Sequence, residues 1–219
     1  MPAVPEPARA RPPAEGVPKG RATRERIVGR ALELAGQRGL DGVTIGDLAT
    51  DLKLSKSGLY AHFKSKERLQ LDVLDAAAAD FSARVFVPAL REPRGLPRLE
   101  AIFERWLAWL RVNASKNGCI FIAGAMEWDD REGVIRDALV HWFEELRQGL
   151  GKSIRLAIEA GHLRSDIDAD QLASDLHSIA LKYHLDQRLM HSPRALPRAR
   201  TAFQRLIDAA RPSPAKTRR

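Results

Sequence analysis

Apolar side chains recur at helical spacing along nearly the whole chain, and no segment shows the strict alternation of a strand. From Thr23 they return every three or four positions until Gly39, a residue type that commonly ends helices. A second, short helix is predicted from Thr44 to about Leu52, because Thr44 followed by Asp47 is typical of a capped helix start. These two segments are the first elements of an all-α fold.

Serines mark the next two helix starts. Ser55 is the predicted N-cap of a third short helix over residues 56–62, and Ser65 begins a longer one that we expect to run to about Val87. Prolines and glycine then cluster over 88–97 and predict a break before a second set of helices.

The second set is longer and more apolar. Residues 102–110 are apolar nearly all round, 119–127 predict a small helix, and Asp129-Asp130 is the predicted cap of a long helix ended by Gly161. Further helices are expected after Asp168, which pairs with Gln171 in another capping pattern, and before Pro212. The total is about nine helices and no strand.

Composition fits one sizeable core or two smaller ones, because 44% of the 219 residues are hydrophobic and 29% are charged. No apolar run approaches the length of a membrane-spanning helix, and the proline-rich N-terminus lacks the apolar stretch of a secretory signal, so we expect a cytoplasmic protein without a membrane partner. The single cysteine, Cys119, excludes an intrachain disulfide and a zinc-finger framework.

Positive charge is unevenly distributed. The net charge is +8, but basic residues outnumber acidic ones mainly in the first 68 residues and in the last nine, whereas 69–210 is close to neutral. Residues 1–20 predict a disordered, basic, proline-rich arm, and 212–219 a basic tail. A basic N-terminal third indicates contact with a polyanion such as nucleic acid.

Two short helices joined by a tight turn, the second with small and polar side chains outward, are typical of a helix-turn-helix that enters the DNA major groove. Lys56 and Lys66 both lie at helix starts, where the helix dipole disfavours a cation by roughly 0.3 to 1 kcal/mol. A docked phosphate would make both positions favourable.

The stretch Thr23 to Leu74 closely resembles the DNA-binding domain of TetR (tetracycline-repressor-like) regulators, above all in its Leu59-Tyr60-x-His62-Phe63-x-x-Lys66-Glu67 core. The resemblance implies a DNA-binding domain over 21–81 with its helix-turn-helix at 44–63, and a helical ligand-binding and dimerisation domain over 82–211. It further implies phosphate contacts from Thr44, Gly46, Tyr60, His62 and Lys66, and base-edge contacts from Lys56, Ser57 and Gly58. Lys56 is the candidate for reading a guanine edge.

The resemblance also implies a homodimer, formed by the last two helices as a four-helix bundle with the partner. Its apolar faces would be Leu172, Leu176, Ile179 and Tyr183, and Ala199, Phe203, Leu206 and Ile207. The alternative is that both faces are buried in the chain's own core.

All four tryptophans lie between these two regions, and aromatic rings beside a few polar groups can line an apolar ligand pocket. The candidate ligand-binding residues are Trp106, Trp109, Asn113, Glu127, Trp128, His141 and Trp142. The alternative is that the tryptophans are ordinary core residues. His177, His184 and His191 recur every seven positions, which is not metal-ligand spacing, so neither a metal nor a cofactor is expected.

The sequence therefore predicts a sequence-specific DNA-binding regulator, a repressor that a small-molecule effector releases from a double-stranded DNA operator. The alternative is a helix-turn-helix protein without such a ligand, controlled by a protein partner or architectural. An enzyme is not supported, because the chain has no nucleophile elbow, phosphate-binding glycine loop or H-E-x-x-H motif.

Overall fold

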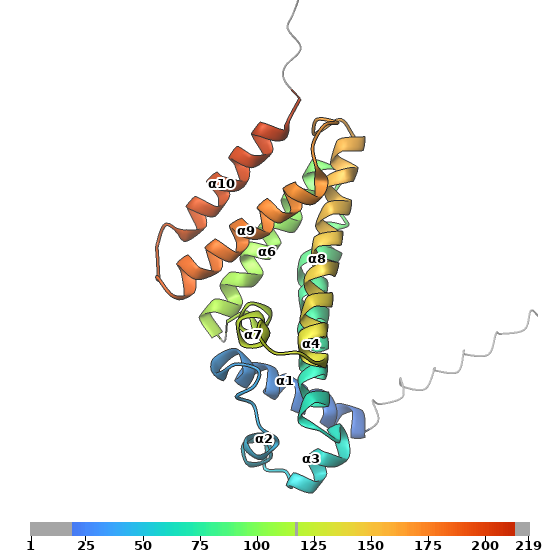
Figure 1. Cartoon of the computed structure of the whole chain (residues 1–219), viewed down its shortest axis with the longest axis vertical. Coiled ribbons are helices and arrows are strands. Elements are labelled where there is room, and N and C mark those ends of the chain that lie inside the picture. The colour runs from blue at the N-terminus through green and yellow to red at the C-terminus, as the bar shows by residue number, and fades with distance from the viewer. Residues whose placement is uncertain (1–18, 117, 213–219) are drawn as a thin grey trace, which may run out of the picture.

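The structure is a computed structural model that describes residues 19–116 and 118–212. All but the first residue of the predicted basic tail, and all but the last two residues of the predicted N-terminal arm, lie outside the described residues. Every regular element in the described part is helical (Figure 1). The elements are α1 (Lys19–Arg38), α2 (Ile45–Leu52), α3 (Lys56–Phe63), α4 (Lys66–Phe81), a π-helical turn η1 (Ser82–Phe86), α5 (Val87–Ala89), α6 (Leu96–Lys116), α7 (Ile120–Trp128), α8 (Val134–Glu159), α9 (Ala169–Arg188) and α10 (Ala195–Ala210).

The all-α prediction is confirmed. Because α4, η1 and α5 follow one another without a break, they form one long helix, and the described residues then hold nine helices as expected. None of these helices is both long and apolar enough to cross a membrane.

The predicted N-caps of α2, α3 and α4 are formed, each by a side-chain hydroxyl that accepts the backbone N–H three residues later. The Thr44 hydroxyl accepts the Asp47 N–H at 3.0 Å, Ser55 accepts that of Gly58 at 3.0 Å, and Ser65 accepts that of Arg68 at 3.1 Å. The Asp168 carboxylate caps α9 in the same way. Each helix of the helix-turn-helix region therefore begins at the predicted residue.

Two helix starts differ from the prediction. α1 begins at Lys19, four residues before Thr23. The predicted cap of the long helix at Asp129-Asp130 is wrong: α8 begins at Val134, after Gly133 at φ 128°. The acidic pair lies in the α7–α8 loop, where the Asp129 carboxylate accepts the N–H of Asp130 instead of a helix N–H.

The long helix α4 joins the two parts of the molecule. Its first half packs against α1 and α3 at the lower end of Figure 1, and its second half packs against α8. Near its end, the buried Phe81 meets Trp106, Trp109 and Trp142 edge to face, with ring centroids 5.0 to 6.1 Å apart. One helix therefore contributes to the core of both parts.

Candidate nucleic-acid interface

The second helix of the helix-turn-helix has one buried and one exposed face. Leu59 and Phe63 of α3 are fully buried, whereas Lys56, Ser57 and Tyr60 are exposed, and Tyr60 leaves 52% of its surface accessible. Among the other predicted contacts, Thr44 is exposed, and Gly46, Gly58, His62 and Lys66 are half-buried. The exposed face of α3 is thus rich in polar and hydrogen-bonding groups.

The starts of α2 and α3 lie against each other. A Cβ on Gly46 would lie 3.6 Å from Cε and 3.8 Å from Nζ of Lys56, so the lysine stem crosses the first turn of α2. Thr44, the cap of that turn, therefore shares a surface with Lys56. Two helix N-termini and one ammonium group face the same region, an arrangement that favours an anion such as a phosphate.

Arg24 of α1 fixes α3 from behind. Its guanidinium forms an ion pair with Asp72 of α4, donates to the His62 carbonyl at 2.5 Å and lies 4.7 Å from the centroid of the Phe63 ring. Asp72 is buried and also binds Arg68 at 2.9 Å. Sequence reasoning missed this network, because helical periodicity gives no sign of a pair 48 positions apart.

Lys66 is not free. Its ammonium donates to the Asp41 carbonyl at 2.6 Å and to the Asp41 carboxylate at 2.7 Å. The same carboxylate accepts from Arg131 of the α7–α8 loop at 3.0 Å. Hydrogen bonds from Lys66 and then Arg131 hold the pKa of Asp41 below its ordinary value. We call this group, together with Glu127, the Asp41 junction.

Glu127, a predicted ligand residue, belongs to the Asp41 junction. Its carboxylate accepts the backbone N–H of Asp41 at 3.1 Å. The α1–α2 loop and the start of α4 are therefore tied to α7 and to the loop that follows it.

The other predicted ligand residues do not gather in one cavity. Trp109 and Asn113 line a cleft of about 270 Å³ between α4 and α6, where the indole N–H donates to Asp80 at 2.9 Å. Trp142 lines a separate cleft of about 200 Å³ between the α4–η1 segment and α8.

The remaining three candidates lie elsewhere. Trp106 is buried, with His177 5.6 Å from its ring. Trp128 is buried with Arg131 over its ring, and His141 is exposed with Glu145 at 3.4 Å. Trp106, Trp109 and Trp142 share Phe81 as a neighbour, but the two clefts are lined by different candidates.

The predicted dimer faces are mostly used within the chain. Leu172, Leu176 and Tyr183 of α9 are buried, because this helix packs against α6, α8 and α10. Ala199, Phe203 and Ile207 of α10 are buried as well, and only Ile179 and Leu206 remain half-buried.

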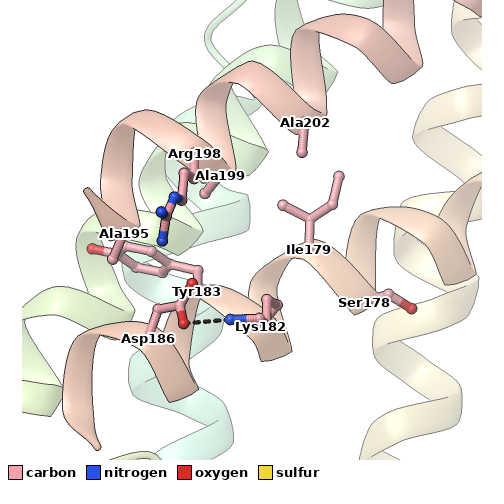
Figure 2. A pocket seen from close by; sticks show the side chains of 9 residues that line it. All are labelled: Ser178, Ile179, Lys182, Tyr183, Asp186, Ala195, Arg198, Ala199 and Ala202. Carbon is pink, nitrogen blue, oxygen red and sulfur yellow. Dashed lines mark hydrogen bonds and ion pairs between the residues drawn. The ribbon is translucent and has the colours of Figure 1, made fainter. Parts of the chain in front are cut away.

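A different face of α9 is open. Leu181, Leu185 and Leu189 are exposed by 38%, 46% and 68%. They lie on a side of the helix next to a groove of about 460 Å³ between α9 and α10. Figure 2 shows this groove, with Ile179 directed toward Ala202, and Lys182 paired with Asp186 on α9.

No group of three or more His, Cys, Asp or Glu side chains in the described part of the chain is arranged to hold a metal ion. Cys119 is buried at the start of α7, and burial raises the pKa of its thiol to about 11. Burial also lowers the pKa of His177 and His184.

Two family models match the sequence. Residues 27–73 match the model for bacterial regulatory proteins of the tetR family, and residues 95–203 match the tetracyclin repressor-like C-terminal domain. Together they span well over half of the chain, including α2, α3, α8 and α9.

Curated relatives are transcriptional repressors. The HTH-type transcriptional repressor DhaR of Mycobacterium sp. (strain GP1) is 24% identical over 70% of this chain and 76% of its own. The class D tetracycline repressor protein of Escherichia coli is 37% identical over 43% of this chain and 37% of its own.

Solved structures share the fold. A TetR transcriptional regulator from Chloroflexus aurantiacus is 28% identical, with a TM-score of 0.72 over 87% of this chain and 94% of its own. AibR, solved in complex with isovaleryl coenzyme A and operator DNA, is 18% identical, with a TM-score of 0.63 over 85% of this chain and 97% of its own.

Proposed function

The chain belongs to the TetR family of DNA-binding transcriptional regulators, and on that premise we propose that it is a repressor whose α3 reads an operator and which a small molecule releases. It is a regulator and not an enzyme, like its relatives. The observation that carries the proposal is the exposed face of α3, with Lys56 lying across the start of α2.

Lys56, Ser57 and Gly58 are proposed to face base edges in the major groove. Lys56 extends from the first turn of α3, the part of a recognition helix that contacts bases, and its ammonium can donate to O6 and N7 of a guanine. A Cβ at Gly58 would lie 3.0 Å from the Ser55 hydroxyl that caps the helix, so glycine preserves this cap.

Thr44, Gly46, Tyr60, His62 and Lys66 are proposed to contact the phosphate backbone. An ammonium has three N–H donors, and Lys66 uses two on Asp41, which leaves one for a phosphate. Arg24 supports these contacts indirectly, because it holds the end of α3 at the His62 carbonyl.

The homodimer is proposed to use the open face of α9, Leu181, Leu185 and Leu189, together with the α9–α10 groove. One helix-turn-helix reads only a few base pairs, and dimers bind two half-sites about one helical turn apart. The exposed leucines of α9 and the apolar groove drawn in Figure 2 offer surface that a second copy would bury.

Release by a small molecule is proposed to act through α4 and the Asp41 junction. Both connect the DNA-binding end to the helices around the two clefts, so a ligand that prefers one arrangement of α4 would shift the position of α3. A neighbour with the same fold, AibR, has been solved with both isovaleryl coenzyme A and operator DNA, which supports a ligand-responsive regulator.

The test is fluorescence anisotropy of the purified protein on a labelled duplex from the DNA flanking its own gene, across a salt series and with a scrambled competitor. Nanomolar-range binding that resists the competitor is expected for an operator. Equal, weak binding to both duplexes would contradict recognition of that DNA. Screening metabolites for release in the same assay then separates the proposal from its alternative, a helix-turn-helix protein controlled by a protein partner.

A further inference from the structure

The cleft between the α4–η1 segment and α8 has an unusual lining. Three of its eight lining residues are aromatic, Phe81, Phe86 and Trp142, and one carries a carboxylate, Glu145. The cleft measures about 200 Å³ and opens to solvent beside two helices that run next to each other in Figure 1.

The three rings stand at steep angles to one another. Phe81 and Phe86 have centroids 5.9 Å apart and planes at 66°, and Phe81 and Trp142 are 5.5 Å apart at 71°. One face of Trp142 is covered by Phe121, which stacks on it at 3.6 Å and 4°. The rings therefore form walls in different orientations, and Trp142 is held in place from behind.

The backbone places Phe86 in this cleft. Phe86 ends the π-helical turn that interrupts the long helix, and such turns are rare and occur frequently at functional sites. On the opposite side, a Cβ at Gly149 of α8 would lie 3.2 Å from two carbons of the Phe86 ring. The π-helical turn brings the Phe86 ring toward α8, and Gly149, which has no side chain, leaves room for it there.

Glu145 supplies the negative charge. Its side chain is 62% exposed, and its carboxylate lies 3.4 Å from Nε2 of His141, one helical turn earlier. The faces of aromatic rings are electron-rich, so rings and a carboxylate together attract a cation and disfavour an anion.

We propose that this cleft binds an organic cation with a quaternary ammonium group. The group is large, apolar at its surface and unable to donate a conventional hydrogen bond, so aromatic walls suit it better than a set of hydrogen-bond acceptors. Binding of such a cation is argued from the lining of the cleft alone. A role as the effector site rests in addition on the proposed ligand-responsive function, because the ligand would contact both α8 and the helix that leads to α3.

The direct test is calorimetric titration of the full-length protein with choline and with 3,3-dimethyl-1-butanol. The second compound has the same shape as choline but carries a carbon in place of the charged nitrogen. Saturable binding of choline, with binding of the neutral compound at least about tenfold weaker, is expected if charge and aromatic walls act together. Absence of choline binding, or equal binding of both compounds, would overturn the site.

Matched variants locate the binding. Glu145→Gln removes the charge without changing the size of an exposed side chain, and should weaken choline binding about threefold. Glu144→Gln makes the same change one position away, on a residue that lines the α8–α9 groove instead, and should leave binding unchanged. Phe86→Leu should abolish choline binding while the circular dichroism spectrum stays helical. If Glu145→Gln and Glu144→Gln weaken choline binding equally, the assignment of the cation site to this cleft is overturned.

Operator anisotropy separates this inference from the proposed function. Choline binding that depends on Glu145 but leaves the operator bound supports the cation site and contradicts release by this ligand. A protein that binds its operator, and is released by another metabolite, but does not bind choline upholds the proposed function and overturns the cation site.

Discussion

Glu127 accepts a hydrogen bond from the backbone N–H of Asp41, a residue 86 positions earlier in the chain. The contact also explains the glycine beside it: Gly39 has φ +83°, and a Cβ there would lie 1.7 Å from the Glu127 carboxylate. A carboxylate of the C-terminal part thus occupies the space that glycine leaves in the loop between α1 and α2. The DNA-binding end and α7 are joined by a specific polar contact and not by apolar packing alone.

Removing this carboxylate should loosen the connection. Glu127→Ala leaves the Asp41 N–H without its charged acceptor, and we expect a loss of about 1 kcal/mol in the free energy of unfolding. Urea denaturation followed by circular dichroism measures it. Glu132→Ala removes an exposed carboxylate from the nearby α7–α8 loop and is the control. Equal midpoints for both variants would show that the contact adds no stability.

Asp41 should make stability depend on acidity. Its pKa is lowered by hydrogen bonds from Lys66 and Arg131, so the folded state binds its proton more weakly than the unfolded state. The stabilisation is therefore complete above the unfolded pKa of about 4 and is lost as the pH falls through the folded pKa.

The comparison that isolates this effect is between the parent protein and Asp41→Asn. The parent should unfold at higher urea concentration near neutral pH, and the two midpoints should approach each other as the pH is lowered from about 5 toward 3. If the difference between the two urea midpoints stays constant over this pH range, the charge of Asp41 does not cause the difference in stability.

Lys56 and Lys66 should affect DNA binding in different ways. Lys56→Ala is expected to reduce discrimination between operator and scrambled duplex by about 1 to 3 kcal/mol, since it removes a base-edge contact. Lys66→Ala should weaken binding to every sequence and lower the slope of binding against salt by about one. Anisotropy titrations measure both, with Arg94→Ala, exposed in the α5–α6 loop, as the control. If both lysine variants lose the same affinity for the operator and for the scrambled duplex, the division of roles is wrong.

Dimerisation should depend on the open face of α9. Leu185→Glu places a charge on a leucine that is already 46% exposed, so the subunit should fold while the dimer dissociates. Light scattering should give about twice 24.4 kDa for the parent and a value near 24.4 kDa for the variant. Val134→Glu makes the same kind of change on an exposed residue at the start of α8 and should remain dimeric. A monomeric parent at micromolar concentration would contradict the dimer.

Cys119 should be unreactive in the folded protein. Burial raises its pKa to about 11, so at neutral pH it is a protonated thiol without access to solvent. Ellman's reagent should label it slowly in buffer and completely in guanidinium chloride. Rapid labelling of the native protein would show that the start of α7 opens readily.

Local signals in the sequence predicted local structure. Thr44, Ser55, Ser65 and Asp168 cap helices at the expected positions, because a cap involves only the next two or three residues. The Asp129-Asp130 cap was wrong because the same residue types can satisfy a loop, and only the backbone at Gly133 decides where α8 begins.

Contacts between distant segments could not be predicted in this way. An apolar stripe shows that Leu172 and Leu176 are buried, but not whether a partner or the chain's own helices cover them. Trp106, Trp109 and Trp142 all pack around Phe81, yet Trp109 and Trp142 line different clefts and Glu127 binds the Asp41 N–H. Similarly, the position of Lys66 at a helix start indicated an anion, and the structure places the carboxylate of Asp41 against it.

The π-helical turn at 82–86 also bears on how the protein could change over generations. Such a turn holds one residue more than regular α-helix, and each residue rotates a helix by about 100°. Because the turn spreads one extra residue over about one rotation, loss of a single codon within it would restore an ordinary helix and leave the residues on either side facing as before. The turn is thus a place where the gene can gain or lose one codon and leave the rest of α4, including its contacts with α1 and α3, in place.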